Sequence, residues 1–433
     1  MIAGLIIGFF IVILLSLWFI FSPYRLSKIW RYFLGNLEMS AGLDVVLTKN
    51  EAVIDIDYIL KRFGERHPAA IKGIPQTMIK QAQIEKNNLP EQITVLQLWQ
   101  ATARILAVLR DGHTRMEYLT KNILCLPFTF QYSNNKLISV EGDFIGCEVL
   151  SIGGISINDL YNTKKSQFSY ELDGYLNFDF ARNCRSKHFL AFLNVDVSEP
   201  ISLVFDTPEG EVSQKYEFAK PKETQNEQSN KYVWYSIDKE NNLGIFTLTK
   251  CKIDKVYHEN LNNFFDEVKN AEITNIVVDL RENSGGISKV VDMFLKYLDV
   301  DCYRVYGDTD IRLGFILWKS KSKMKSNPKK HNLLYQGAVF VLTSSYTFSS
   351  ATAFAQTISD NKIGKIVGEI SGGMPSCYGD IVPFQTPSAK LGFTISYKYF
   401  RRPDENKDEL PLIPDYPCTA KDALDNLYTI LQK

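Results

Sequence analysis

Residues 339–353 read VFVLTSSYTFSSATA, an apolar run followed by a cluster of hydroxyl-bearing residues. The run is typical of a buried strand, and the residues after it predict the start of a helix. Ser349 lies at this junction, where we expect it at the edge of the sheet beside the first free N–H groups of the helix. These groups favour the negative charge that develops when a nucleophile attacks a carbonyl. The alternative is that Ser349 or Ser350 only caps the helix.

A second strand-to-turn signal lies about seventy residues upstream, where residues 276–286 read IVVDLRENSGG. Gly285 and Gly286 have no side chain to cover their backbone N–H groups, so these groups are natural donors for an oxyanion hole. A third segment follows the serine cluster, where residues 363–369 read IGKIVGE and predict another strand. Each signal alone is common, and the three in this order are far more specific.

Together the three segments resemble the tail-specific (C-terminal processing) protease family, peptidase family S41, including its tricorn-like branch. There a strand ending Asp-Leu-Arg-x-Asn-x-Gly-Gly precedes a Thr-x-Ser-Ala-(Ser/Ala) nucleophile turn, and a Val-Gly-Glu strand follows. The resemblance covers roughly residues 232–416. It implies a crotonase-like or Clp-protease-like βα superhelical core in an α/β fold. It also implies that Ser349 is the nucleophile and that the N–H of Ser350, with that of Gly285 or Gly286, holds the oxyanion.

The predicted general base departs from the best-known branch of that family, which carries a lysine in the pattern Gly-Glu-x-Thr-x-Gly-Lys. Residues 368–374 read GEISGGM, so Met374 replaces the lysine, and a thioether cannot take a proton from serine. The sequence DGHT at residues 111–114 matches a signature of tricorn-like members that lack the lysine and use histidine as the base. His113 can accept and return a proton near neutral pH. The alternative is a histidine that caps a turn.

A third group is expected to orient the imidazole. In tricorn-like enzymes a serine precedes the histidine and a distant glutamate supports it, whereas Gly112 precedes His113 here. The candidate acids are Asp111, Glu405 and Glu409, and the sequence does not choose among them. Asp111 is alternatively a helix-end residue that contacts the backbone.

The N-terminus predicts a membrane anchor. Residues 2–22 are uncharged and apolar, and as a helix at about 1.5 Å per residue they would span the ~30 Å hydrocarbon layer. The basic leader and small-residue cleavage site of a signal peptide are missing, so we expect a retained transmembrane helix at residues 1–24. Arg25, Lys28 and Arg31 follow it, which by the positive-inside rule places the large domain in the cytoplasm. The family resemblance implies the opposite side, so the side stays open.

The rest of the chain divides into three predicted regions. Residues 50–118 form a helical region, with one helix interrupted at His67-Pro68 and a second at about 92–109. Residues 120–220 read as short strands and turns, and the segment 146–160 resembles a PDZ module, which binds a peptide end as an added strand. Residues 232–433 alternate strands with helices, which predicts a mostly parallel sheet covered by helices. Within this core, residues 303–334 are expected to be a surface insertion or lid.

Composition limits the partners. Lys plus Arg and Asp plus Glu both total 49, so no net charge attracts nucleic acid. The seven cysteines are scattered without a C-x-x-C pair, which disfavours a disulfide framework or a zinc site, and no cofactor or metal is implied. The predicted function is a membrane-anchored serine endopeptidase that acts on C-terminal tails or unfolded segments of polypeptides. The oligomeric state is not indicated.

Two alternative functions remain. The first is a degenerate relative that binds peptides or apolar ligands without cleaving them. The missing lysine supports it, as does Thr352 at a position where the family prefers glutamate. The second is another crotonase-like enzyme that acts on small acyl substrates.

Overall fold

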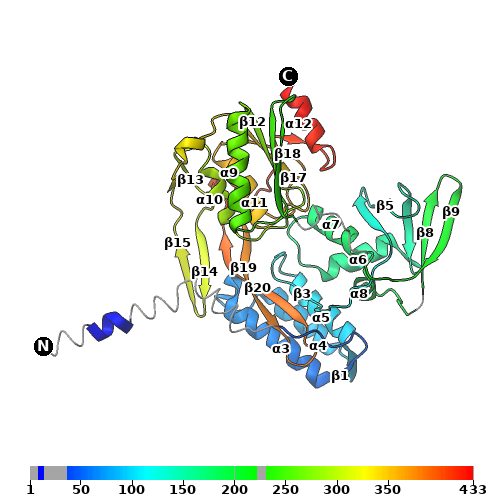
Figure 1. The fold of residues 1–433 in the computed structure, drawn as a ribbon. Helices are drawn as coiled ribbons and strands as arrows, with labels where there is room; N and C mark the ends of the chain where they lie inside the picture. The colour runs from blue at the N-terminus through cyan, green and yellow to red at the C-terminus, as the bar shows by residue number, and fades with distance from the viewer. Residues whose placement is uncertain (1–7, 14–36, 199, 222–230, 433) are drawn as a thin grey trace.

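The computed structural model describes residues 8–13, 37–198, 200–221 and 231–432, and every structural statement below refers to them (Figure 1). Most of the predicted anchor at residues 1–24 lies outside these residues. Its described part, residues 8–13, is a short helix with exposed side chains. A search of the described helices finds none with both the length and the apolar character that a bilayer crossing requires.

The N-terminal helical region forms as predicted. The helix α3 (Lys49–Arg66) ends before His67-Pro68, and a short 3₁₀ turn, η1 (Pro68–Ala70), follows. Two further helices are α4 (Gln76–Asn87) and α5 (Val95–Ala107). Thr48 and Thr94 each begin a helix with a capping box, and they close the paired strands β1 (Val46–Thr48) and β2 (Gln92–Thr94).

The region predicted as β-rich contains more helix than the sequence indicated. Its sheet has the order β4-β5-β6-β8-β9, and β7 pairs with β6. The bounds are β4 (Thr129–Ser133), β5 (Lys136–Glu141), β6 (Glu148–Ile152), β7 (Ile155–Ser156), β8 (Ile201–Thr207) and β9 (Gly210–Tyr216). Three helices are inserted between β7 and β8, namely α6 (Ile157–Gln167), α7 (Asp173–Asn183) and α8 (Lys187–Phe192). These helices lie between the sheet and the rest of the molecule (Figure 1).

The core contains the predicted sheet, in the order β10-β11-β12-β17-β18-β21. Only β10 is antiparallel to its neighbour, so the expectation of a mostly parallel sheet is confirmed. The bounds are β10 (Val233–Asp238), β11 (Leu243–Leu248), β12 (Asn275–Asp279), β17 (Ala338–Thr343), β18 (Lys365–Gly368) and β21 (Tyr416–Pro417). One face packs on α9 (Lys255–Asn270), α10 (Lys289–Leu295) and α11 (Ser350–Asp360), and the other on α12 (Ala423–Leu431).

A second sheet joins the core to the helical region. It has the order β15-β14-β20-β19, and β3 (Met116–Glu117) pairs with β20. Its other strands are β14 (Thr309–Leu313), β15 (Ile316–Ser320), β19 (Cys377–Gln385) and β20 (Gly392–Phe400). The segment expected as a surface insertion therefore contributes the hairpin β14–β15, and the short strands β13 (Cys302–Tyr303) and β16 (Lys325–Ser326) flank it. Through β3, this sheet brings the turn at residues 111–114 beside the core.

Candidate active site

Ser349 is the residue immediately before α11 (Ser350–Asp360) and adopts a strained conformation. Its φ of 55° and ψ of −121° lie in a region that residues with a side chain rarely adopt. Its side chain makes no capping hydrogen bond, which argues against the capping alternative. The turn is held by the loop that follows β12, because Phe348 N donates to Asn283 O at 3.1 Å. A strained serine between a strand and a helix is the geometry of a nucleophile elbow.

The two glycines after β12 lie directly against this turn. A Cβ on Gly285 would lie 2.8 Å from Ser349 Cβ, and a Cβ on Gly286 would lie 2.3 Å from Cys251 O, so neither position has room for a side chain. The Gly285 N–H donates to Asn283 Oδ1 at 2.8 Å and is therefore engaged. Gly286 lines the cavity beside Ser349. Of the two glycines named from the sequence, the geometry favours Gly286 as the oxyanion donor, together with Ser350, the first residue of α11.

His113 reaches the same cavity from the other side. Its backbone is fixed by β20, since Thr394 Oγ1 donates to His113 O at 2.7 Å. Its ring stacks on Phe348 with centroids 4.6 Å apart, and Phe348 in turn stacks on Tyr175 of α7 at 4.5 Å. His113 and Ser349 both line a cavity of about 320 Å³. The structure therefore brings together the predicted nucleophile and the predicted base, although the two imidazole nitrogens have no hydrogen-bond partner among the described residues.

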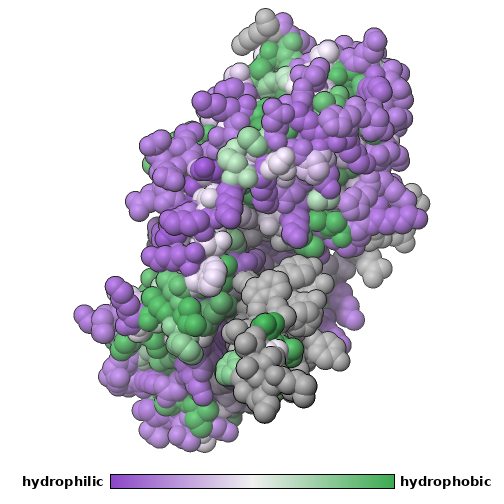
Figure 2. Space-filling view, turned by 90° about the vertical axis from the view of Figure 1, so that its left-hand side faces the viewer, coloured by the Kyte–Doolittle hydropathy of each residue, from purple (hydrophilic) through white to green (hydrophobic). Residues whose placement is uncertain are grey.

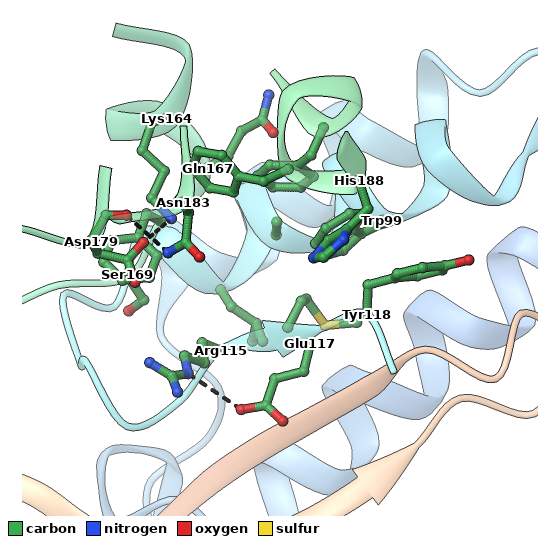
Figure 3. Close-up of a pocket in the computed structure, with 16 residues that line it drawn as sticks. Trp99, Arg115, Glu117, Tyr118, Lys164, Gln167, Ser169, Asp179, Asn183 and His188 are labelled. Carbon is green, nitrogen blue, oxygen red and sulfur yellow. Dashed lines mark hydrogen bonds and ion pairs between the residues drawn. The ribbon is translucent and has the colours of Figure 1, made fainter. Parts of the chain in front are cut away.

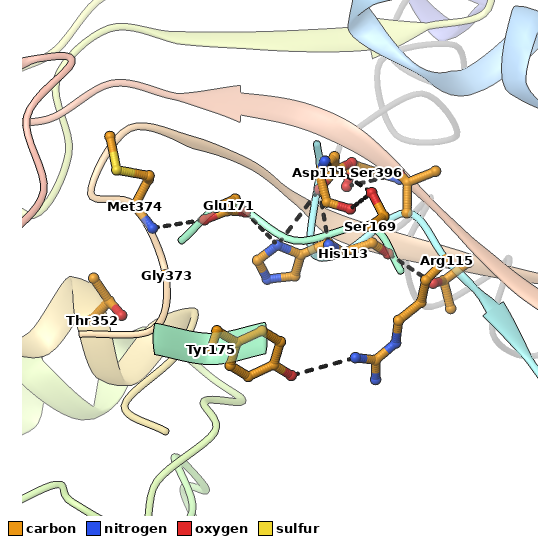
Figure 4. Close-up of polar contacts among 12 residues, drawn as sticks. Asp111, His113, Arg115, Ser169, Glu171, Tyr175, Thr352, Gly373, Met374 and Ser396 are labelled. Carbon is orange, nitrogen blue, oxygen red and sulfur yellow. Dashed lines mark hydrogen bonds and ion pairs between the residues drawn. The ribbon is translucent and has the colours of Figure 1, made fainter. Parts of the chain in front are cut away.

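The acid best placed to orient the imidazole is Glu171, which the sequence did not single out. Its Oε1 lies 3.8 Å from His113 Nδ1, and its Oε2 accepts a hydrogen bond from Met374 N at 2.7 Å (Figure 4). Glu171 Oε1 has no hydrogen-bond partner within the described part of the chain, so it is available to the imidazole. Its position in the loop between α6 and α7 gives no motif by which sequence reasoning could have found it.

Asp111 lies as close to His113 Nδ1, at 3.9 Å, but its oxygens are already used. Oδ1 accepts from the backbone N of His113 at 2.9 Å, and Oδ2 is 3.2 Å from Nε2 of the buried His67. Asp111 therefore shapes the turn, which agrees with its alternative interpretation as a residue that contacts the backbone. The predicted acids Glu405 and Glu409 are exposed on a surface turn and do not line the cavity, which argues against them as partners of His113.

The buried ionisable groups of the site shift one another's pKa values. Burial alone would raise the pKa of Asp111, but the hydrogen bond and charge of His67 outweigh it and lower this pKa to about 2. Burial disfavours the charged imidazole of His113, but Glu171 and then Asp111 outweigh it and raise the pKa of His113 above its usual value. Burial raises the pKa of Glu171, and His113 offsets this only in part. A buried imidazole held between two carboxylates is suited to accepting a proton.

The same three side chains, Asp111, His113 and Glu171, are close enough to share a metal ion, with ligand atoms within 4.8 Å of one another. Since both Asp111 oxygens are committed to His67 and to the backbone, the arrangement fits the orientation of an imidazole better than metal ligation.

Met374 occupies the position at which the family resemblance implied a lysine. Its backbone N–H holds Glu171, and its side chain lines the cavity. Among the described residues around this cavity there is no lysine. Thr352 also lines it, and its hydroxyl donates to Thr347 O at 3.0 Å within the helix start.

A second cavity of about 260 Å³ adjoins the first, because Arg115 and Glu117 line both. Figure 3 shows Trp99, Tyr118 and His188 on one side of it, and the ion pair of Lys164 and Asp179 on the other. The Lys164 Nζ lies 2.5 Å from Asp179 Oδ2, and its charge also lies 3.6 Å from the centre of the Phe168 ring.

Comparison with known proteins identifies the family of the core domain. Residues 242–417 match the family model Peptidase family S41. A search of curated proteins finds no match. The fold is similar to that of mature CPAF, with a TM-score of 0.67 at 14% identity over 89% of this chain and 96% of that chain. Mature CPAF complexed with lactacystin gives a TM-score of 0.66 at 14% identity, with 89% and 97% of the two chains covered.

The photosystem II D1 C-terminal processing protease gives a TM-score of 0.49 at 14% identity, with 88% of this chain and 97% of that chain covered. At these identities the solved structures show the fold alone, and the family assignment comes from the family model. The parts of the cavity that follow β12 and β17 fall inside the matched range, whereas His113 and Glu171 fall outside it. The chain is therefore a serine peptidase with a peptidase family S41 domain at residues 242–417.

Proposed function

We propose that this chain is an endopeptidase in which Ser349 attacks the peptide carbonyl, His113 is the general base and Glu171 orients the imidazole. The observation that carries this proposal is the strained, uncapped Ser349 at the start of α11, in one cavity with His113. The proposed substrates are C-terminal tails or unfolded segments of polypeptides, because an extended chain can enter a cavity that folded surfaces cannot.

The reaction is acyl transfer. Glu171 faces Nδ1 of His113, which leaves Nε2 to take the proton of Ser349 Oγ as this oxygen bonds to the carbonyl carbon. The N–H groups of Ser350 and Gly286 hold the carbonyl oxygen as it becomes negative. His113 then protonates the leaving amine, the C–N bond breaks, and water attacks the acyl-enzyme with His113 again as base. Hydrogen bonds of this kind are often long before the substrate binds and shorten in the complex.

Cleavage of an unfolded protein by the full-length chain in detergent tests the proposal. Ser349→Ala and His113→Ala should each lower the cleavage rate by roughly 10⁴-fold or more, since removal of one triad member disables the others. The matched controls are Ser359→Ala at the far end of α11 and His258→Ala, an exposed histidine on α9. Unchanged cleavage by Ser349→Ala would exclude it as the nucleophile.

Labelling with a fluorophosphonate probe tests activation of the nucleophile separately. The wild-type chain should be labelled at Ser349, and His113→Ala should lose most of this labelling. Equal labelling of His113→Ala and wild type would argue against His113 as the base. A wild-type chain that binds peptides but is neither labelled nor able to cleave them would support the non-cleaving alternative.

We further propose that residues 1–24 anchor the chain in the cell membrane and that the β-rich region binds peptides as a PDZ-like module. The uncharged run at residues 2–22 supports the anchor. The chain should then remain with membranes after a carbonate wash and be released by detergent. Digestion of intact cells by an added protease distinguishes the two sides: cleavage places the domain outside the cytoplasm, and protection places it inside.

A further inference from the structure

The hairpin β14–β15 carries an apolar surface that no described residue covers. Phe315 at its tip is 88% exposed, and Trp318 and Ile316 on β15 are 59% and 49% exposed. Burial of one such side chain is worth roughly 1.5–3 kcal/mol, so three of them side by side are costly to leave in water. Figure 2 views the molecule from the side on which this hairpin lies. Apolar side chains gather in the lower half of that view.

The strand register places these side chains together. Leu313 pairs with Ile316 across a two-residue loop, and Gly314 adopts a φ of 61° there, which leaves Phe315 at the tip. Trp318 pairs with the buried Ile311, so Ile316 and Trp318 extend the core face of the sheet beyond its edge. Because β15 is the edge strand of its sheet, this surface faces outward.

Basic residues follow the apolar tip at every second position. They are Lys319, Lys321, Lys323 and Lys325. Lys321 pairs with Asp308 at 2.7 Å and Lys325 with Asp292 at 3.0 Å. Lys319 and Lys323 are exposed and have no ion-pair partner in the described part of the chain. Aromatic and aliphatic side chains at a tip, with free lysines behind them, match the chemistry of a bilayer interface with anionic headgroups.

The hairpin also points to the end of the sheet at which the chain enters the fold. Because β14 runs antiparallel to β20, with Thr309 opposite Phe400 and Ile311 opposite Lys398, its tip is directed toward the start of β20. At that end, the turn between β19 and β20 holds residues 38–41, since Ala41 N donates to Ala389 O at 3.0 Å.

The length of the intervening sequence allows both elements to meet one membrane. Residues 23–36 separate the apolar run 2–22 from the described chain, and fourteen residues reach at most about 50 Å when extended. A domain held within that distance of a bilayer can bring the hairpin tip to its surface.

We propose that the tip of the β14–β15 hairpin, through Phe315, Ile316 and Trp318 with Lys319 and Lys323, docks on a bilayer surface that carries anionic lipid headgroups. This goes beyond the proposed peptidase function and uses the proposed anchor only to bring the domain near the bilayer. Docking of the hairpin gives the domain a second point of contact with the membrane and so fixes the orientation of the catalytic cavity. The competing possibility is that a second copy of the chain covers this surface by pairing along the edge of β15.

The test uses the full-length chain in vesicles of phosphatidylcholine and phosphatidylglycerol that contain a phospholipid with a photoreactive group in its acyl chain near the headgroup. Mass spectrometry then maps the cross-linked peptides. We expect lipid on residues 313–319 as well as on residues 2–22. In the double variant Phe315→Ser/Trp318→Ser, the amount of lipid cross-linked to the hairpin should fall several-fold. The amount cross-linked to residues 2–22 should not change. Lys319→Gln/Lys323→Gln, pure phosphatidylcholine and high salt should each weaken the hairpin signal.

Ile145→Ser is the matched control, because Ile145 is 67% exposed on a loop of the β-rich region far from the hairpin in sequence. This variant should leave the lipid pattern unchanged. Retained fluorophosphonate labelling of Ser349 shows that each variant is folded, since the hairpin does not line the catalytic cavity. Lipid on residues 2–22 alone overturns the hairpin proposal and leaves the anchor standing. Cross-links between copies across β15 assign the surface to a dimer, and lipid on neither segment overturns both.

Discussion

The two walls of the catalytic cavity are built in different ways. The wall of Ser349 and Gly286 is formed by loops at the ends of adjacent parallel strands and is bonded internally: Thr347 Oγ1 donates to Leu280 O at 2.8 Å, and Ser344 Oγ donates to Arg281 O at 2.5 Å. The facing wall of His113 and Glu171 comes from the helical region and from the loop before α7. Its backbone is anchored, but the atoms that would act in the reaction are not hydrogen-bonded to each other.

This difference shows which half of the site is preorganised. The oxyanion donors cannot move without breaking strand-end hydrogen bonds, whereas the imidazole and its carboxylate need only a small approach to form a hydrogen bond. Substitutions in the first wall should therefore be costly and independent of pH. Substitution of Glu171 in the second wall should be milder and should change the pH profile, whereas substitution of His113 removes the proposed base itself.

Among substitutions that leave Ser349 and His113 in place, the largest effect is expected for Gly286→Ala. A Cβ there would meet Cys251 O at 2.3 Å, so the loop must move and its N–H would be misplaced, which costs roughly 10²–10³-fold in kcat. Gly210→Ala is the matched control, because Gly210 also has a positive φ, 112°, but its Cβ would have nothing within 4 Å. If both variants keep the wild-type kcat, the oxyanion hole does not lie at Gly286.

Glu171→Gln should lower kcat/KM roughly tenfold to hundredfold, the worth of a hydrogen bond to a charged group. The pH profile gives a sharper result. Glu171 raises the pKa of His113, and the base must be neutral, so activity should rise with pH through a pKa above 6.5. Loss of the carboxylate lowers that pKa, so the acidic limb should move to lower pH. Glu409→Gln, an exposed acid outside the cavity, should leave the whole profile in place.

Asp111→Asn should act on stability more than on chemistry. The substitution weakens the bond to buried His67, at a cost of about 1–3 kcal/mol in the free energy of unfolding. The pKa of Asp111 is lowered from 3.8 to about 2 in the folded chain. Its contribution to stability is therefore present above pH 3.8 and is lost as the pH falls toward 2. Thermal unfolding across this range should show that loss in the wild type and a smaller one in the variant.

The smallest effect is expected for Met374→Leu. The contact that Met374 makes with Glu171 uses its backbone N–H, which leucine retains, and leucine has nearly the same volume. Peptide cleavage should fall by less than about tenfold, since such exchanges usually cost under 1.5 kcal/mol. A large loss would mean that the thioether itself contacts the substrate.

The predictable half of the site is the half encoded by local sequence. Ser349 and Gly286 sit in motifs that also specify the strands before them, and His113 sits in a four-residue signature at the end of a helix. Glu171 could not be found in this way, because tertiary contacts place it. Ser169 donates to Asp111 O at 2.7 Å and accepts from Asp111 N at 3.0 Å, which brings the loop of Glu171 to the turn of His113.

The fold, like the site, could be predicted where local sequence encodes it. Strand–helix alternation predicted the parallel sheet, because its strands lie side by side in the same order as in the sequence. The second sheet was not predicted, since β3 pairs with β20 across some 275 residues and nothing in either strand specifies that partner. The helices α7 and α8 were also missed within a region interpreted as strands and turns. The sequence of α7 is weakly periodic and α8 has only 6 residues, so both acquire helical structure from packing rather than from local preference.

The aromatic stack of Tyr175, Phe348 and His113 links parts of the chain that are otherwise independent. Phe348 precedes the proposed nucleophile Ser349, and its ring contacts the ring of the proposed base His113 and that of Tyr175 on α7. A shift of α7, such as one driven by a peptide bound to that region, would therefore reach the imidazole through a single intervening ring. Regulation of turnover from a distance would then require no hinge, only a sub-ångström slide between flat surfaces.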